Sequence, residues 1–84
     1  MYELIFTKKF LDKLKKLEKQ VQGRVIAVIE RSRIRPEKHF DRLVGEKAYK
    51  LRVGKYRVIA DINKKEMKIL ILDVGHRKKI YGGK

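Results

Sequence analysis

Three basic side chains in the segment YKLRVGKYR have the spacing of an anion-binding site. If the Gly-Lys pair in the middle of this segment forms a two-residue hairpin turn, Arg52 lies directly opposite Arg57, and Lys50 lies on the same face of the sheet. Like charges directly opposite each other destabilise a sheet, so an anion between them would stabilise it. A guanidinium can bind two phosphate oxygens at once, whereas an ammonium supplies a compact charge. The pattern therefore predicts a phosphate site, although in a chain with 24 Lys and Arg residues the same pairing also arises by chance.

The segment GHRKKIY, which follows the apolar run ILILDV, contains three further candidates, namely His76, Arg77 and Tyr81. A regular third strand would place Leu72 beside Arg57 and deliver this segment to the same end of the sheet. We therefore expect Arg77 to join the phosphate site. Histidine exchanges protons near neutral pH, and tyrosine can stack on an RNA base. Both also have an ordinary interpretation, as a surface histidine and as a tyrosine that packs near the chain end.

Metal and thiol chemistry find no support in the sequence. The chain contains no cysteine, which excludes disulfides, thiolate ligands and thiol catalysis and agrees with a reducing compartment. Its two histidines, His39 and His76, belong to no cluster with the spacing of metal ligands, so we expect no metal and no other cofactor.

The net charge of +14 is the strongest global signal in the sequence. A surface this cationic repels itself unless a polyanion or an acidic partner neutralises part of it, which indicates nucleic acid, an acidic protein or both. No apolar run approaches the roughly 20 residues of a membrane-spanning helix, and MYELIFTKKF lacks the order of a signal peptide. We therefore expect a cytoplasmic protein without membrane contact. The heavy use of Lys, Arg, Glu and Ile is typical of thermophilic proteins.

The elements that must position these residues follow from the apolar pattern of the chain. YELIF predicts a first strand, which ends at Thr7, a residue type that caps helices well. Apolar residues three and four positions apart then predict an amphipathic helix from Lys8 that Gly23 interrupts, and a second helix that ends before Pro36. One kinked helix is the alternative. The residues expected on the core side of the first helix are Phe10, Leu11, Leu14, Leu17 and Val21.

After the connecting residues 35–47, the apolar period changes from that of a helix to that of a strand. The segments YKLRV, YRVIADI and MKILILDV predict a three-stranded antiparallel meander, joined by the Gly-Lys turn and the polar loop NKKE. One face of this meander is apolar enough to receive the helices, so we expect a single domain, residues 1–84, with a two-layer α+β fold. That face carries Tyr49, Leu51, Val53, Tyr56, Val58, Ala60, Ile62, Met67, Ile69 and Ile71.

The segments YKLRVGKYRVIADI and ILILDVGHRKKIY closely resemble the RelE toxins of bacterial and archaeal toxin–antitoxin systems, within the RelE/ParE superfamily. The resemblance extends over essentially the whole chain. It implies a β-α-α-β-β-β fold of the microbial-ribonuclease type and cleavage of messenger RNA in the ribosomal A site. The residues that match the family's functional positions are Lys50, Arg52, Arg57, Arg77 and Tyr81.

The end of the chain differs from that of the better-studied members. Those members have more residues between the arginine and the tyrosine and continue into a C-terminal helix, whereas only GGK follows Tyr81 here. His76 stands where other members have lysine or histidine. Base stacking and proton transfer to the 5′-oxygen are the roles left open for Tyr81 and His76.

The activity that the resemblance implies is metal-independent RNA cleavage, which needs a base for the 2′-hydroxyl and cations at the phosphate. Lys50 or Arg52 would activate the 2′-hydroxyl, and Lys50 is favoured because a guanidinium gives up its proton poorly. Arg57 and Arg77 would hold the scissile phosphate and stabilise its growing charge. Such a dispersed site would depend on the ribosome to align the RNA.

The resemblance also implies partners. These are the ribosome with its mRNA, and an acidic RelB-like antitoxin that wraps the toxin in a toxin–antitoxin complex. Two other classes of protein remain open. A ParE-like member would poison DNA gyrase without cutting RNA, although the GHRKKIY ending favours the ribonuclease branch. A non-enzymatic basic module would bind ribosomal RNA with steep salt dependence and produce no new mRNA ends.

Overall fold

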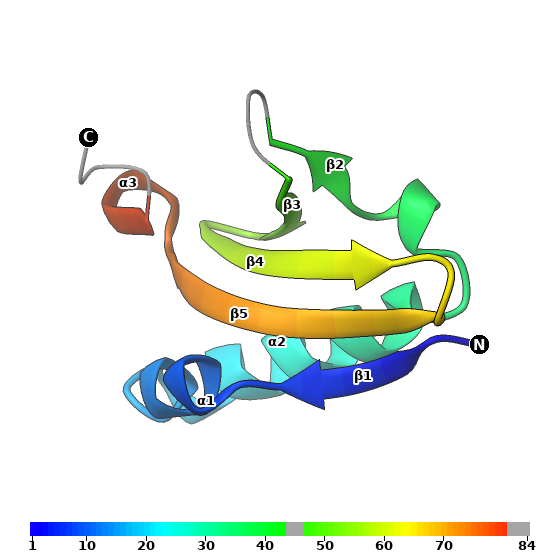
Figure 1. The fold of residues 1–84 in the computed structure, drawn as a ribbon. Coiled ribbons are helices and arrows are strands. Elements are labelled where there is room, and N and C mark those ends of the chain that lie inside the picture. The colour runs from blue at the N-terminus through cyan, green and yellow to red at the C-terminus, as the bar shows by residue number, and fades with distance from the viewer. Residues whose placement is uncertain (44–46, 81–84) are drawn as a thin grey trace.

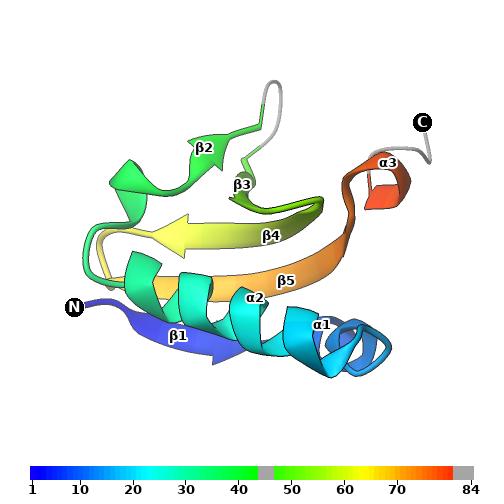
Figure 2. The ribbon, with the colours of Figure 1, turned by 180° about the vertical axis from the view of Figure 1, so that it is seen from behind.

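The computed structural model describes residues 1–43 and 47–80, and in these ranges five strands form one mixed sheet with two helices packed on one face (Figures 1 and 2). The strand order is β1-β5-β4-β3-β2. This is the two-layer α+β architecture that the sequence predicted. In chain order the elements are β1 (Glu3–Phe6), α1 (Lys8–Leu14), α2 (Lys19–Ser32), a 3-10 turn (Pro36–Lys38), β2 (Asp41–Arg42), β3 (Tyr49–Val53), β4 (Tyr56–Asn63), β5 (Lys68–His76) and α3 (Arg77–Ile80).

The first strand lies at one edge of the sheet and runs parallel to β5, with Leu4 opposite Ile69 and Phe6 opposite Ile71. Leu4 and Phe6 pack against the core between sheet and helices. The alternate residue Ile5, opposite Leu70, lies on the face that the helices do not cover and is 36% exposed. The sheet therefore has one covered and one open face, and the open face is available for a site.

A short strand, β2, extends the other edge of the sheet, where the sequence predicted only a connection. Asp41 lies opposite Lys50 and Arg42 opposite Tyr49, and the Leu43 amide donates to the Ala48 carbonyl at 2.9 Å. Two residues are too few to show an alternating pattern, so this pairing has no signature in the sequence. Its consequence is that the Asp41 side chain lies on the open face beside Lys50.

The hairpin between β3 and β4 has the predicted register. Val53 lies opposite Tyr56 and Arg52 opposite Arg57, which confirms the two-residue loop of Gly54 and Lys55. Gly54 has a φ of 60°, and a glycine with positive φ at the first loop position is what a type II′ turn requires. The turn twists in the same sense as the strands, so it fixes which side chains share the open face.

The register of β5 differs from the prediction, because Gly75 rather than Leu72 lies opposite Arg57. The loop before β5 has the expected four residues but is displaced by one position, to residues 64–67: Asn63 lies opposite Lys68, and Met67 is a loop residue with positive φ that is 44% exposed instead of facing the core. A β-bulge between Ile59 and Ala60 adds a further residue to β5.

The bulge has a clear physical cause in the sequence of β5. Strict alternation after Ile69 and Ile71 would point Asp73 into the core. The extra residue lets Ile71 and Val74 both face the core, where they are 0% and 1% exposed, and leaves Asp73 outside it. Burying a carboxylate without a partner would cost far more free energy than interrupting the backbone hydrogen bonds between β4 and β5 at one position.

The two helices form two separate segments, but the break falls at residues 15–18 rather than at Gly23, which lies inside α2. Tight turns end α1: the Lys16 amide donates to the Lys13 carbonyl at 3.1 Å, and the Leu17 amide donates to the Leu14 carbonyl at 3.0 Å. No atom lies within 4 Å of a Cβ built on Gly23, so this glycine is on the solvent side of its helix. Its lack of a side chain therefore leaves the packing intact.

A single core joins the helices to the covered face of the sheet. Leu11 is an exception to the predicted core set, since it is 40% exposed. Helix α1 has only seven residues, and its buried stripe is limited to Phe10 and Leu14. The buried apolar residues are Phe10, Leu14, Val25, Ile29, Phe40, Leu51, Val53, Val58, Ala60, Ile69, Ile71 and Val74. No helix within the described ranges is long and apolar enough to cross a membrane.

Candidate anion-binding site

The open face of the sheet contains a hollow of about 270 Å³ that is lined by three cationic side chains and one carboxylate. Three adjacent strands supply one or two side chains each, and the strand pairing places them side by side. The residues that line the hollow are Asp41 from β2, Lys50 and Arg52 from β3, and Arg57 from β4. The structure thus brings together three of the basic residues singled out in the sequence.

Arg57 is the most unusual of these residues because its charged side chain is buried, with only 6% of the residue exposed. Among the described residues, its guanidinium makes one hydrogen bond, from Nη1 to the Tyr56 carbonyl at 3.3 Å, and takes part in no ion pair. A guanidinium carries five N–H donors, and a buried charge without a partner is costly. The remaining donors are therefore suited to an anion that enters the hollow.

Arg52 lies directly opposite Arg57 and is exposed, so it can reach the same anion from the solvent side. Lys50 is half-buried and lies on the same face, opposite Ile59. The hollow carries three cations and one carboxylate, a net charge of two positive units. This balance attracts phosphate groups, and the two guanidinium planes favour bidentate binding.

Asp41 is a member of the hollow that sequence reasoning missed. The residue belongs to β2, which has no recognisable pattern, so nothing in the sequence linked it to the basic hairpin. The connecting residues 35–47 contain three of the chain's ten acidic residues, and nothing in the sequence distinguished Asp41 from the other two. The carboxylate is exposed, and none of the ion pairs among the described residues includes it.

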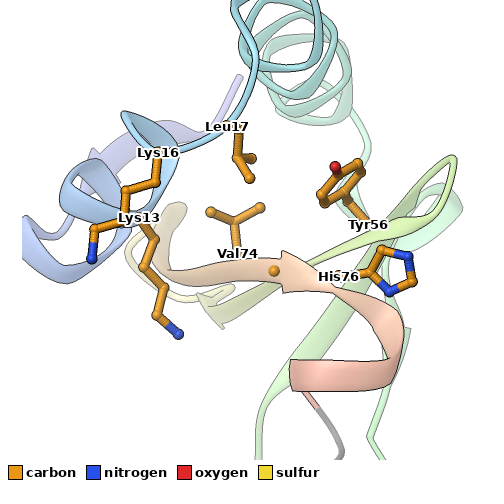
Figure 3. A pocket seen from close by; sticks show the side chains of 7 residues that line it. Lys13, Lys16, Leu17, Tyr56, Val74 and His76 are labelled. Carbon is orange, nitrogen blue, oxygen red and sulfur yellow. The ribbon is translucent and has the colours of Figure 1, made fainter.

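His76 lies on the other face of the sheet. It is the cross-strand partner of Tyr56, and the two ring centroids are 5.7 Å apart in an edge-to-face arrangement. The Lys78 amide donates to His76 Nδ1 at 3.3 Å. Figure 3 shows His76 and Tyr56 at one side of a pocket of about 450 Å³, with Leu17 and Val74 converging on its centre. The pocket is completed by Lys13, Lys16 and Gly75.

Arg77 begins α3, where its amide donates to the Lys55 carbonyl at 2.9 Å. Its exposed side chain lines a separate hollow of about 530 Å³ together with Lys55, His76 and Lys78. The chain therefore reaches the expected end of the sheet, but the Arg77 side chain lines a different hollow from that of Arg57. Tyr81 lies outside the described residues.

The described part of the chain contains no group of three or more His, Cys, Asp or Glu residues placed to hold a metal ion.

Solved structures share this fold over nearly the whole chain. A chain of the toxin–antitoxin complex RelBE2 from Mycobacterium tuberculosis matches with a TM-score of 0.83 and 25% identity, covering 90% of this chain and 98% of that chain. The archaeal RelE–RelB complex from Pyrococcus horikoshii matches with a TM-score of 0.74 and 28% identity, over 90% and 94% of the two chains. The RelB–RelE complex from Methanococcus jannaschii gives 0.72 and 26%, over 94% and 96%. The chain thus has the α+β fold of the RelE toxins.

The family assignment rests on the sequence as a whole. The chain belongs to the family described as the ParE toxin of the type II toxin–antitoxin system parDE, whose model matches residues 4–81. It is therefore a type II toxin of the RelE/ParE superfamily, as the segments around the basic hairpin predicted. No curated protein sequence matches the chain.

Proposed function

We propose that this toxin is a metal-independent endoribonuclease that cuts messenger RNA in the ribosomal A site and so inhibits translation in the cytoplasm. The observation that carries the proposal is the buried Arg57 guanidinium, which has no ion-pair partner among the described residues and faces a second arginine across the hairpin. Such a pair is poorly suited to stabilising the fold by itself. It is well suited to holding a phosphate whose charge grows during cleavage.

The scissile phosphate binds between Arg52 and Arg57, and Lys50 contacts the ribose beside it. Arg77, from the neighbouring hollow, holds the RNA backbone where it leaves the sheet. Tyr81 stacks on a base, and His76, which lines the hollow of Arg77, contacts the RNA backbone there. The candidate groups are distributed over two hollows, so we expect the ribosome to supply the alignment of the RNA.

An acidic antitoxin is the second partner in this proposal. The structures from Mycobacterium, Pyrococcus and Methanococcus are toxin–antitoxin or RelB–RelE complexes. The net charge of +14 favours a partner of opposite sign, and long-range attraction would speed the association. By covering the cationic hollow, a RelB-like chain would exclude RNA from Arg57.

A gyrase poison is the second candidate function, because the matching family is described by its ParE toxin. In that case the basic surface would bind a protein–DNA complex and no RNA would be cut. The GHRKKIY ending together with the cations of the hairpin favours RNA cleavage.

The decisive experiment adds the purified toxin to translating ribosomes and maps the mRNA ends. We expect the wild type to generate ends within A-site codons, and Arg57→Ala and Arg77→Ala to slow this by about 10²-fold, as loss of one charge-stabilising group typically does. Arg31→Ala, which removes an exposed arginine from α2, is the matched control and should cut normally. Unchanged cleavage by both site variants would refute the site. Absence of cleavage by the wild type, together with inhibition of gyrase supercoiling, would refute the nuclease in favour of the gyrase poison.

A further inference from the structure

We propose that Asp41 is the general base of the RNA cleavage reaction, an inference that rests on the nuclease function proposed above. Cleavage begins when the 2′-hydroxyl loses its proton, so the site needs a group that can accept one. Of the four residues that line the hollow, three are cations whose nitrogens carry protons. A protonated ammonium or guanidinium offers donors and no acceptor, whereas an ionised carboxylate offers acceptors alone. Asp41 is thus the lining residue equipped for this step.

The strand pairing brings the Asp41 carboxylate to the reacting group. Asp41 lies directly opposite Lys50, and Lys50 lies two residues from Arg52 on the same face of β3. Side chains of directly opposed residues start about 5 Å apart. A phosphate held by Arg52 and Arg57 therefore has its adjoining ribose within reach of β2.

Asp41 also differs in its surroundings from Asp12 and Asp73, which both form ion pairs with lysines. Asp12 is held by Lys8 at 3.3 Å, and Asp73 is held by Lys13 at 3.0 Å. Asp41 has no such partner among the described residues. Its exposed side chain lines the hollow, and within residues 1–43 and 47–80 no hydrogen bond or ion pair engages the carboxylate, as suits a proton acceptor.

The reaction balances with Asp41 and solvent water. Asp41 takes the proton of the 2′-hydroxyl, the 2′-oxygen forms a bond to the adjacent phosphorus, and the bond from phosphorus to the 5′-oxygen breaks. The departing 5′-oxygen takes a proton from a water molecule on the opposite side of the phosphorus, and the products are a 2′,3′-cyclic phosphate and a 5′-hydroxyl. The hydroxide that remains accepts the proton of the Asp41 carboxylic acid, so the carboxylate regains its starting charge.

The alternative role for Asp41 is electrostatic. A carboxylate among three cations could simply lower the local positive charge and keep the hollow from binding anions indiscriminately. The two roles predict opposite effects for its removal. If Asp41 is the base, its removal slows cleavage of bound RNA. If Asp41 only lowers the local positive charge, its removal tightens RNA binding, and cleavage of bound RNA stays equally fast or becomes faster.

The test measures cleavage of ribosome-bound mRNA by wild type, Asp41→Asn and Asp41→Glu, with kcat and KM determined separately. We expect Asp41→Asn to lower kcat by about 10²-fold or more with KM unchanged or lower, and to abolish the rise of the rate with pH on the acidic side. Asp41→Glu, which keeps the carboxylate, should recover part of kcat. Asp61→Asn is the matched control, because Asp61 is also exposed on the open face but lies opposite Leu70, away from the hollow.

Each outcome has a distinct meaning. Normal or faster cleavage by Asp41→Asn, while the wild type cuts, overturns Asp41 as the base and leaves the nuclease intact. No cleavage by the wild type overturns the nuclease and the base together. Thermal unfolding of each variant shows whether it is folded at the assay temperature. We expect Asp41→Asn to stay folded, because Asp41 is exposed on a two-residue strand. A loss of kcat that Asp41→Glu shares in full, with the same flattened pH profile, would also overturn the proposal.

Discussion

Arg52 and Arg57 lie directly opposite each other across β3 and β4, and among the described residues neither is bound to a carboxylate. The folded protein therefore holds two like charges together that the unfolded chain would separate. An anion that binds between them should stabilise the fold, because it binds the native state alone.

Inorganic phosphate should accordingly raise the midpoint of thermal unfolding more than sodium chloride does at the same ionic strength. Binding at a hundred times the Kd would add about 2.7 kcal/mol to the free energy of unfolding. Arg57→Met should lose this specific increment, whereas Arg31→Met, which alters an exposed arginine of α2, should keep it. Equal shifts in all three proteins would mean that phosphate acts through general salt effects.

Alanine substitutions of Gly23 in α2 and of Gly54 in the hairpin should change the free energy of unfolding in opposite directions. Gly23 lies within α2 with open space around its Cβ position, so Gly23→Ala should raise the free energy of unfolding by about 0.5–1 kcal/mol. Gly54 has a φ of 60°, a conformation that alanine adopts with strain, so Gly54→Ala should lower it by about 1 kcal/mol or more. Urea unfolding measures both. A loss of stability in Gly23→Ala would indicate that this glycine is needed for flexibility or close packing.

The hairpin shows what the sequence could predict and why. The alternating apolar residues of YKLRV and YRVIADI and the Gly-Lys turn are local features of the chain. Together they predicted the pairing of Arg52 with Arg57 correctly. Local turn chemistry and alternation determine such a register without knowledge of the rest of the molecule. The candidates Lys50, Arg52 and Arg57 were found for this reason.

The register of β5 and the contribution of β2 could not be predicted in the same way, because each depends on distant contacts. The bulge arises because Val74 fits the core and Asp73 does not, a preference that only the assembled helices and sheet express. Asp41 enters the hollow through a two-residue strand that pairs with β3. The break between α1 and α2 was misplaced at Gly23 because an exposed glycine is tolerated inside a helix at modest cost.

Thr7 joins the start of α1 to β5 and should be sensitive to loss of its hydroxyl. Its Oγ1 accepts the Phe10 amide at 3.2 Å, which caps the helix, and donates to the Ile71 carbonyl at 2.8 Å and to the Leu72 carbonyl at 3.2 Å. Thr7→Val keeps the shape and removes all three contacts, so we expect a loss of about 1–2 kcal/mol in the free energy of unfolding. Thr7→Ser, which keeps the hydroxyl, is the control and should retain most of the stability. An equal loss in Thr7→Ser would mean that the methyl group contributes as much as the hydroxyl, and unchanged stability of Thr7→Val would contradict the role of the hydroxyl.

Asp73 couples α1 to the end of β5, and this coupling can be measured separately from the overall charge. Its side chain is only 15% exposed, its Oδ1 accepts the Val74 amide at 2.8 Å, and its two oxygens contact Lys13 at 3.0 Å and Lys9 at 3.5 Å. Removing a lysine from a chain of net charge +14 also relieves repulsion, so a single substitution of Lys13 mixes two opposing effects.

A double-mutant cycle with Lys13→Met and Asp73→Asn removes this ambiguity, because the general charge effect cancels between the two sides of the cycle. We expect a coupling free energy of about 0.5–1 kcal/mol in low salt, reduced by 0.5 M sodium chloride, since the Lys13 end of the pair is partly exposed. The matched control is the cycle for Lys8 and Asp12, a solvent-exposed pair one helical turn apart, for which about 0.3 kcal/mol is expected. Equal coupling in the two cycles would show that the position of Asp73 beside the bulge adds nothing to an ordinary surface ion pair.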